Sequence, residues 1–185
     1  MYQSTPPWDI GRPQKEFLRL ADEGAIRGGV LDVGCGTGEH TLMAAARGLD
    51  AIGIDTTAAA IDAAQQKARE RGIHARFRLH DAIDLPALGE QFDTALDCGL
   101  FHVFSDEDRR AFVDGLSAVV RPGGRYFMLC FSERQPGDFG PRRVTQAEIR
   151  SSFARGWKID SIEPAALENN GGADILGWLA CLTRT

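Results

Sequence analysis

The stretch Val30-Leu31-Asp32-Val33-Gly34-Cys35-Gly36-Thr37-Gly38 runs from an apolar segment into three glycines at alternate positions. The apolar periodicity predicts a strand over about 29–34 and a helix over about 38–48. Glycines allow the backbone to turn sharply between these elements and leave no side chain between the loop and a ligand. The stretch therefore predicts a strand, a ligand-binding loop and a helix in immediate succession.

A second short apolar run ends at Asp55, about 20 positions after Gly34. At this spacing, the carboxylate that closes the second strand of a Rossmann-type sheet accepts hydrogen bonds from a ribose diol. A dinucleotide fingerprint carries a glycine where this chain has Glu39, and a carboxylate there would repel a pyrophosphate. The pattern therefore indicates a nucleoside ligand and disfavours the alternative of a nicotinamide-dependent dehydrogenase.

The rest of the chain alternates predicted strands with predicted helices. Further strands are expected over about 50–55, 74–80, 92–97, 125–131, 157–162 and 175–183. Further helices are expected over about 14–23, 57–72 and 145–154, and in a segment that opens at 105–108 and is broken at 119–124. Repeated strand–helix units imply a parallel sheet with helices on both faces. The last two strands are linked too closely for a parallel crossover, so they are expected to form an antiparallel hairpin.

The composition is that of an ordinary globular domain, with 185 residues, 43% apolar residues and a net charge of −5. No apolar run approaches the ~18 residues that span a bilayer, and the N-terminus lacks the features of a signal peptide. The four cysteines are far apart, which fits free thiols in a reducing cytoplasm. We therefore expect one cytoplasmic domain without a membrane partner. No nucleic acid partner is expected either, because no basic stripe is present.

The glycine loop resembles motif I of the class I S-adenosylmethionine (SAM)-dependent methyltransferases, and residues 116–126 resemble the entrance to their fifth strand. The resemblance implies one Rossmann-like α/β domain over residues 1–185. Its seven-stranded sheet is mostly parallel, with helices on both faces and an antiparallel C-terminal hairpin. SAM is the implied cofactor and S-adenosylhomocysteine the product. In that family the acid that matches Asp55 binds both ribose hydroxyls, and the loop packs against the amino-acid end of the cofactor. The matching loop residues are Gly34, Cys35, Gly36 and Gly38.

The resemblance extends to the ends of the third and fourth predicted strands. In the family, an acid after the third strand accepts a hydrogen bond from the adenine amino group, and the backbone amide of the next residue contacts the adenine ring. Asp81 and Ala82 match these two positions. Capping a helix is the alternative for Asp81. The segment after the fourth strand lies between cofactor and substrate, so Cys98 and Gly99 are expected at the cofactor. Cys98 is more often a small core residue than a nucleophile.

The N-terminal segment 7–13 contains Trp8 and resembles the entrance segment of the thiol, halide and thiopurine methyltransferases and their bacterial small-molecule relatives. There the tryptophan packs near the methionine end of the cofactor, and its ring face suits a sulfonium through cation–π attraction. Trp8 is therefore predicted to contact cofactor and acceptor; the alternative is a tryptophan that only anchors the arm on the core. We expect residues 1–28 to form a lid, 29–134 the cofactor-binding core, and 135–185 the C-terminal helix and strands.

Phe101 and His102 follow the fourth strand, where the acceptor should enter. His102 is the candidate general base, with shaping of the pocket as the alternative. The sequence contains no obvious acid/base pair and no cluster of metal ligands, so no metal is expected and a thiol, with a pKa near ~8.5, is the favoured acceptor. Arg142 and Arg143 either recruit an anionic substrate or form an exposed basic pair.

These patterns predict transfer of a methyl group from SAM to a small-molecule nucleophile, a thiol or other soft acceptor. O- or N-methylation of a small aromatic or natural-product substrate is the alternative, and a SAM-binding module without catalysis is a more remote one. The sequence leaves the oligomeric state open.

Overall fold

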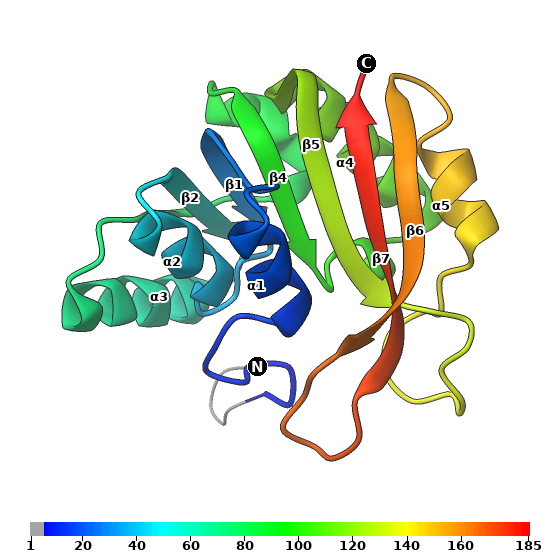
Figure 1. Cartoon of the computed structure of the whole chain (residues 1–185), viewed down its shortest axis with the longest axis horizontal. Helices are drawn as coiled ribbons and strands as arrows, with labels where there is room; N and C mark the ends of the chain where they lie inside the picture. The colour runs from blue at the N-terminus through cyan, green and yellow to red at the C-terminus, as the bar shows by residue number, and fades with distance from the viewer. Residues whose placement is uncertain (1–5) are drawn as a thin grey trace.

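The computed structural model describes residues 6–185, so the start of the predicted lid, residues 1–5, lies outside the described residues. The strands are β1 Gly29–Val33, β2 Asp50–Asp55, β3 Arg76–Leu79, β4 Phe92–Cys98, β5 Val120–Phe131, β6 Trp157–Leu167 and β7 Ile175–Arg184. They form one sheet in the order β3-β2-β1-β4-β5-β7-β6 (Figure 1). The first five of these run parallel, and β7 is antiparallel to both β5 and β6. The predicted seven-stranded α/β fold with an antiparallel C-terminal hairpin is confirmed.

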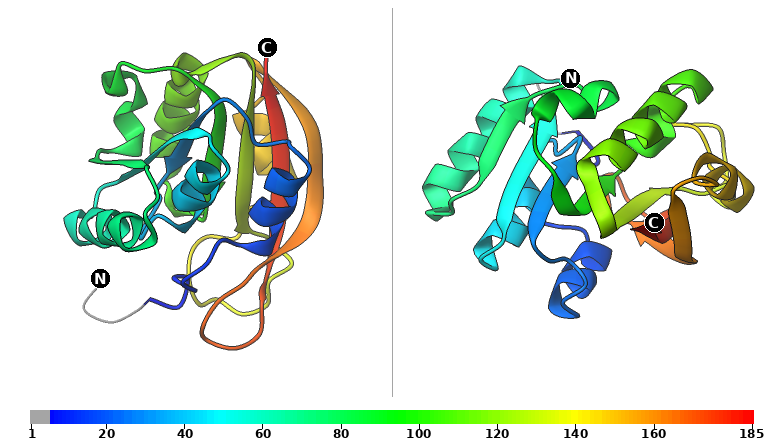
Figure 2. Two further views of the ribbon diagram at one scale, coloured as in Figure 1. Left: turned by 60° about the vertical axis from the view of Figure 1, so that its left-hand side comes forward. Right: turned by 90° about the horizontal axis from the view of Figure 1, so that it is seen from above.

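Helices cover both faces of this sheet, as predicted. They are α1 Lys15–Asp22, α2 Glu39–Ala46, α3 Ala58–Arg71, α4 Asp106–Val119 and α5 Gln146–Ser152, with two short 3-10 turns, η1 Ala82–Leu88 and η2 Phe101–Val103. In Figure 1 and Figure 2, α1 and α2 lie on one face and α4 and α5 on the other, while α3 lies along β2 and β3. The predicted helices are confirmed close to their expected bounds, but the sequence pattern does not predict the 3-10 turns. No helix within residues 6–185 is long and apolar enough to cross a bilayer.

The start of β5 differs from the predicted strand over 125–131. Phe92 of β4 already pairs with Val120, and the next pair joins Thr94 to Arg125. The residues between these two pairs bulge out of the ladder, so the strand begins before the Pro-Gly-Gly segment rather than after it.

β3 and β6 also differ from prediction. β3 is shorter than the expected 74–80, whereas β6 continues past 162 and includes Pro164. Proline lacks a backbone donor and is tolerated in strands at the edge of a sheet. β6 is such an edge strand, which explains why a residue that normally argues against a strand lies within it.

The hydrophobic core lies on both faces of the sheet, and β5 contributes to each. Alternate residues of a strand point to opposite faces. Phe127 packs in a cluster with Phe17 and Leu20 of α1, whereas the preceding residue, Tyr126, packs against Phe112 of α4. Because all of these side chains are nearly or fully buried, the strand is held firmly, and the loop that follows it has a fixed starting point.

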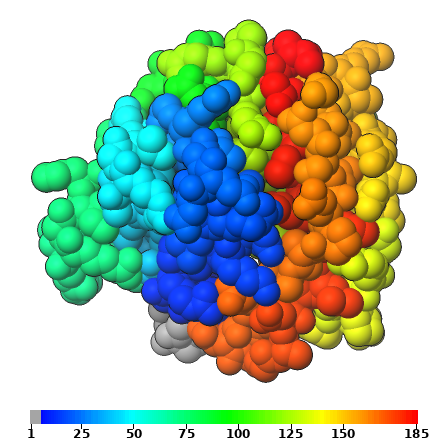
Figure 3. Space-filling model, viewed as in Figure 1, coloured from blue at the N-terminus to red at the C-terminus, as the bar shows by residue number. Residues whose placement is uncertain are grey.

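The carboxyl ends of the parallel strands meet at one edge of the sheet, which points downward in Figure 1. The segment before α1 and the hairpin loop between β6 and β7, residues 168–174, lie against each other at this edge (Figure 3). Ligands of open α/β sheets bind beyond the carboxyl ends of the strands. The functional site is therefore expected at this edge.

Candidate functional site

The glycine loop after β1 holds three residues in the left-handed region of backbone space. The φ angles of Gly34, Gly36 and Gly38 are 65°, 52° and 86°. A Cβ atom on Gly34 would lie 3.2 Å from Leu100, and one on Gly38 would lie 2.7 Å from the ring of Phe77. The outer two glycines are thus required by the protein's own packing as well as by backbone conformation.

Asp55 lies at the end of β2, as predicted, and its half-buried carboxylate is fixed by the backbone of two loops. Its Oδ2 accepts a hydrogen bond from the amide of Gly36 at 3.0 Å, and its Oδ1 accepts one from the amide of Thr57 at 2.8 Å. Each carboxylate oxygen can accept a further hydrogen bond. The group is therefore oriented to accept hydrogen bonds from a diol.

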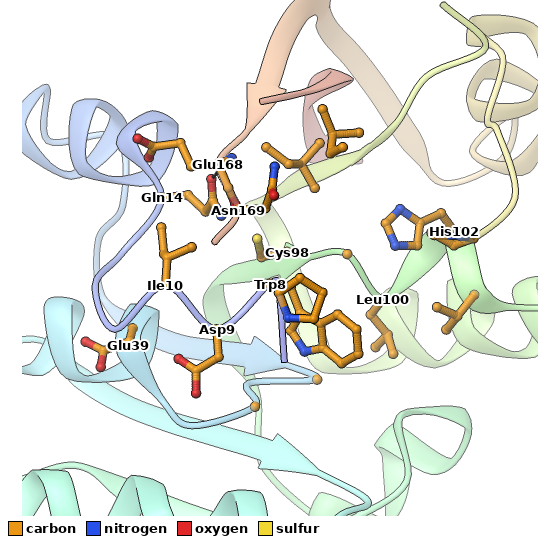
Figure 4. A pocket seen from close by; sticks show the side chains of 18 of the residues that line it. Trp8, Asp9, Ile10, Gln14, Glu39, Cys98, Leu100, His102, Glu168 and Asn169 are labelled. Carbon is orange, nitrogen blue, oxygen red and sulfur yellow. Dashed lines mark hydrogen bonds between the residues drawn. The ribbon is translucent and has the colours of Figure 1, made fainter. Parts of the chain in front are cut away.

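Two adjoining cavities open at this edge, and Figure 4 shows the larger one. The larger cavity, of about 500 Å³, is lined by the glycine loop, the N-terminal segment, the residues after β4, and the loops before α5 and β7. The smaller cavity, of about 380 Å³, lies between the ends of β2 and β3 and the turn η2. The residues that line both are Gly34, Asp55, Leu100 and Val103. Asp55 thus stands where the two cavities meet.

Asp81 and Ala82 line the smaller cavity. Asp81 also caps η1, because its Oδ1 accepts a hydrogen bond from the amide of Ile83 at 2.9 Å. Asp81 therefore lies at the predicted position beside the cavity and also caps a helical turn, as the alternative interpretation expected. The site adjoining Asp55 has the size and polar groups expected for an adenosine.

The segment after β4 contributes unevenly to the larger cavity. Cys98, Gly99 and His102 line it, as the sequence predicts. Phe101 does not: its ring is fully buried in the core, stacked on Phe153 with 5.8 Å between the ring centres. The prediction that Phe101 contacts the acceptor is therefore corrected. The turn η2 directs this ring into the core, whereas its neighbours Leu100 and His102 line the cavity. Burial raises the pKa of the Cys98 thiol, so the thiol is neutral at this wall.

His102 is buried and held by the backbone of β5. Its Nδ1 accepts a hydrogen bond from the amide of Phe131 at 3.0 Å, and its ring packs edge-on against the ring of Phe131. Burial, reinforced by the nearby guanidinium groups of Arg143 and Arg109, lowers the pKa of His102 to about 4. The imidazole is therefore neutral at pH 7 with its proton on Nε2, the nitrogen that lies over Gly99. This arrangement favours a hydrogen-bond donor over a general base.

Trp8 lines the larger cavity with 55% of its surface exposed, so this side chain is not what anchors the N-terminal segment on the core. Neighbouring residues anchor it instead. The carboxylate of Asp9 accepts a hydrogen bond from the hydroxyl of Thr37 in the glycine loop at 3.0 Å. The amide of the buried Gln14 donates to Nε2 of His40 in α2 at 3.1 Å. The segment therefore crosses the glycine loop with the Trp8 ring at the cavity (Figure 4).

A second set of contacts, which we call the clasp, joins Arg12, Gln14 and Lys15 to Glu168 at the end of β6. The Glu168 carboxylate accepts hydrogen bonds from the Arg12 guanidinium at 2.9 and 3.0 Å and from the Lys15 amide at 3.1 Å. The Gln14 side chain pairs with the backbone of Glu168 through two hydrogen bonds of 2.8 and 2.9 Å. Sequence reasoning missed the clasp because its two sides lie far apart in the chain.

The carboxylate of Glu39, at the start of α2, is paired with cationic side chains. It is only 7% exposed and accepts hydrogen bonds from Lys67 and Arg71 of α3, each at 2.8 Å. Burial alone would raise the pKa of Glu39, but these two cations hold it below its ordinary value. Glu39 is therefore not the free carboxylate that would repel a pyrophosphate, and its presence weighs less against a dinucleotide than the sequence suggests.

Arg142 and Arg143 have separate structural roles. Arg142 pairs with Asp106 and Glu148, away from the cavities. The Arg143 guanidinium donates to four backbone carbonyl groups of the loop before α5, those of Gln135, Gly137, Phe139 and Pro141. Arg142 is exposed and ion-paired, whereas Arg143 is half-buried and held by the loop, so the two do not form the expected exposed basic pair. Arg143 instead shapes the loop that carries Phe139 to the larger cavity.

Comparison with known proteins agrees with this geometry. Residues 30–124 match the family described as the methyltransferase domain. The 2-heptyl-1-hydroxyquinolin-4(1H)-one methyltransferase of Mycobacteroides abscessus is 37% identical over 169 residues, which cover 90% of this chain and 74% of that protein. A solved structure reported for the conversion of a disulfide bond into a thioacetal group during echinomycin biosynthesis is 35% identical. It has a TM-score of 0.90 and covers 98% of this chain and 86% of that one.

The magnesium protoporphyrin IX methyltransferase of Synechocystis PCC 6803, solved with bound SAM, shares the fold. Its TM-score is 0.72 at 21% identity, over 92% of this chain and 76% of that one. The cavities described above fit SAM, because an oriented carboxylate stands between an adenosine-sized cavity and a larger one that reaches the glycine loop. The alternative of a nicotinamide-dependent dehydrogenase is excluded. The cofactor is SAM, and the chain belongs to the methyltransferase domain family.

Proposed function

We propose that this protein methylates a small, apolar aromatic molecule at a hydroxyl or thiol that ionises without help from a protein base. The observation that carries the proposal is the state of His102, the buried titratable side chain at the wall where the acceptor should enter. Its Nδ1 is occupied by the Phe131 amide, and its pKa of about 4 leaves it a weak base. A nucleophile at this wall must therefore be acidic enough to ionise by itself.

The other acidic and imidazole groups around the larger cavity support the same conclusion. Asp9 accepts a hydrogen bond from Thr37, and His40, whose pKa burial lowers to about 4, accepts one from the Gln14 amide. Glu39 and Glu168 are held by cations, and Asp55 is held by two backbone amides. The Cys98 thiol is neutral. Among the described lining residues, none of these groups is placed to take a proton from an acceptor beside His102.

SAM, when bound, supplies an activated methyl group on a sulfonium. The residues that would hold it are Asp55 for the ribose hydroxyls, the loop 34–38 for the amino-acid end, and Asp81 with Ala82 for the adenine. The ring face of Trp8 is suited to a cation. The protein then needs only to orient the acceptor and to exclude water from it.

The walls and the relatives together indicate an apolar aromatic acceptor. Trp8, Leu100, Phe131 and Phe139 supply aromatic and aliphatic surface to the larger cavity. One relative is named for a hydroxyquinolone, in which the hydroxyl is on a heteroaromatic ring. The other is described by the formation of a thioacetal, which is sulfur chemistry. One relative thus supports oxygen as the methylated atom and the other supports sulfur. We extend both to an aromatic O–H or S–H that is acidic enough to ionise by itself.

Methylation of three acceptors, 1-hydroxyquinolin-4-one, thiophenol and phenol, would test this. We expect turnover of the first two at pH 7.5 and little of phenol, whose pKa is near ~10. For each acceptor, kcat/KM should rise with pH and level off at the acceptor's own pKa, as measured by transfer of labelled methyl groups. Mass spectrometry of the products identifies the methylated atom.

The variant His102→Asn is the matched control, because its side-chain oxygen can replace Nδ1 as acceptor for the Phe131 amide. We expect this variant to keep kcat within about tenfold and to keep the same pH profile, whereas loss of a general base would cost ~10²–10⁴-fold. Rapid methylation of phenol at pH 7.5 that collapses in His102→Asn would contradict the proposal and restore His102 as the base.

We further propose that the N-terminal segment, residues 6–28, acts as the lid over the cofactor and that the clasp holds it closed. Glu168→Ala removes the acceptor for Arg12 and Lys15. We expect amide exchange in residues 9–15 to become at least about tenfold faster in this variant, and added S-adenosylhomocysteine to slow it in the unmodified protein. Glu163→Ala, at an exposed position on β6, the strand that precedes Glu168, is the control. Equal exchange in residues 9–15 in all three proteins, with and without ligand, would rule out the lid.

A further inference from the structure

Large apolar side chains are exposed at few places in residues 6–185, and most of these places surround one opening. The exposed large apolar residues are Trp8, Leu79, Val103, Phe139 and Leu176. Three of them, Trp8, Val103 and Phe139, line the larger cavity, with exposed fractions of 55%, 60% and 56%. We call these three side chains the rim.

The rim is assembled from three separate parts of the chain. Trp8 comes from the N-terminal segment, Val103 from the end of η2, and Phe139 from the loop before α5. Each is held by neighbours rather than by its own side chain. The Arg143 guanidinium binds the carbonyl of Phe139 at 2.9 Å, and the amide of Val103 donates to the carbonyl of Leu100 at 3.0 Å. The apolar surface is therefore preformed in the absence of a ligand.

The size of the rim favours a ligand over a protein partner. Two half-exposed aromatic rings and one valine offer on the order of 300–400 Å². A stable protein interface buries about 800 Å² on each partner, so a second copy of the chain would gain too little from this surface alone. An alkyl chain of a few carbons, in contrast, matches an apolar strip that continues directly from a cavity.

We propose that the rim binds an alkyl tail carried by the acceptor, while the aromatic head lies in the larger cavity beside His102. The acceptor is then an amphiphilic aromatic compound, with its reactive atom inside and its tail along Trp8, Val103 and Phe139. This inference rests on the proposed function for the nature of the head, and the experiment below separates the two.

The test uses 1-hydroxyquinolin-4-ones that carry 2-alkyl chains of one, three, five and seven carbons. Calorimetry with the S-adenosylhomocysteine complex measures their affinity without any turnover, and labelled SAM measures their methylation. Burial of a methylene group strengthens binding about three- to fourfold. We therefore expect the affinity to rise about two- to fourfold per added carbon until the tail extends past the rim.

The variant Val103→Ser with Phe139→Ser removes most of the rim without touching the core, because both side chains are more than half exposed. We expect it to lose most of the gain in affinity with chain length, measured relative to its own affinity for the methyl compound. Leu79→Ser is the matched control, since Leu79 is 55% exposed but lines neither cavity. It should keep the full dependence on chain length.

Each outcome bears on one proposal or the other. Affinity that does not increase with chain length overturns the rim proposal, as does a gain that persists unchanged in the double variant. Dimerisation that disappears in the double variant overturns it as well, in favour of a protein partner. Tail-dependent binding without methylation supports the rim but contradicts the proposed function. Methylation that is independent of chain length supports the proposed function and contradicts the rim.

Discussion

Asp55→Ala is expected to weaken the binding of SAM by about 2–3 kcal/mol, or roughly 30- to 150-fold in Kd. Two hydrogen bonds from the ribose to a charged acceptor would be lost. The amides of Gly36 and Thr57 would also lose the carboxylate that orients them. Calorimetric titration with SAM, and with S-adenosylhomocysteine, measures the change directly.

Asp50→Ala is the matched control for this prediction. Asp50 is at the opposite end of the same strand, is exposed, and pairs only with Arg76 among the described residues. A surface ion pair of this kind contributes little to stability, so the affinity for SAM should stay within about twofold. An unchanged affinity in Asp55→Ala would contradict the assignment of Asp55 to the ribose.

Gly38→Ala is expected to lower the free energy of unfolding by about 3–4 kcal/mol. A left-handed backbone costs an alanine roughly 1–2 kcal/mol, and overpacking costs typically ~1–3 kcal/mol more. Both penalties apply here, because φ is 86° and the new Cβ would lie 2.7 Å from Phe77 and 2.8 Å from Ala64. Thermal unfolding should shift downward by about 10 °C for a chain of this size.

Gly48→Ala separates the two penalties. Gly48 lies after the C-terminal end of α2, whereas Gly38 lies before its N-terminal end. The φ of Gly48 is 80°, but a Cβ atom on Gly48 would meet nothing within 4 Å. The loss should be about 1–2 kcal/mol, the cost of the left-handed conformation alone. If the two variants were equally stable, close packing of α2 against α3 and β3 would not be the reason for glycine at position 38.

The fold was predictable because its signals are local. Alternating apolar runs and glycine or proline breaks indicate strands and helices through neighbouring residues, and the short link before β7 indicates an antiparallel pair. The extension of β6 through Pro164 could not be predicted in this way. It depends on β6 lying at the edge of the sheet, and the order of strands is decided by packing between distant segments.

The positions of the candidate residues on the cofactor side were predictable for a related reason. The glycine loop and Asp55 are marked as candidate cofactor residues by their residue types and spacing, which the sequence displays. The state of His102 depends on an amide hydrogen bond from Phe131, and the clasp depends on Glu168. Both partners are brought close only by the fold. Residue type alone marks His102 as a candidate base, whereas its surroundings favour a donor.

The position of β7 has a consequence for synthesis of the chain. β7 is made after β6, yet it lies between β5 and β6 in the sheet. While the ribosome is still extending the chain, β6 has no strand to pair with and β5 presents an open edge, the kind of edge that promotes aggregation. The turn that carries Glu168 takes its place only when β7 is inserted. Both open edges are therefore covered only when β7, the last strand to be synthesised, takes its place between β5 and β6.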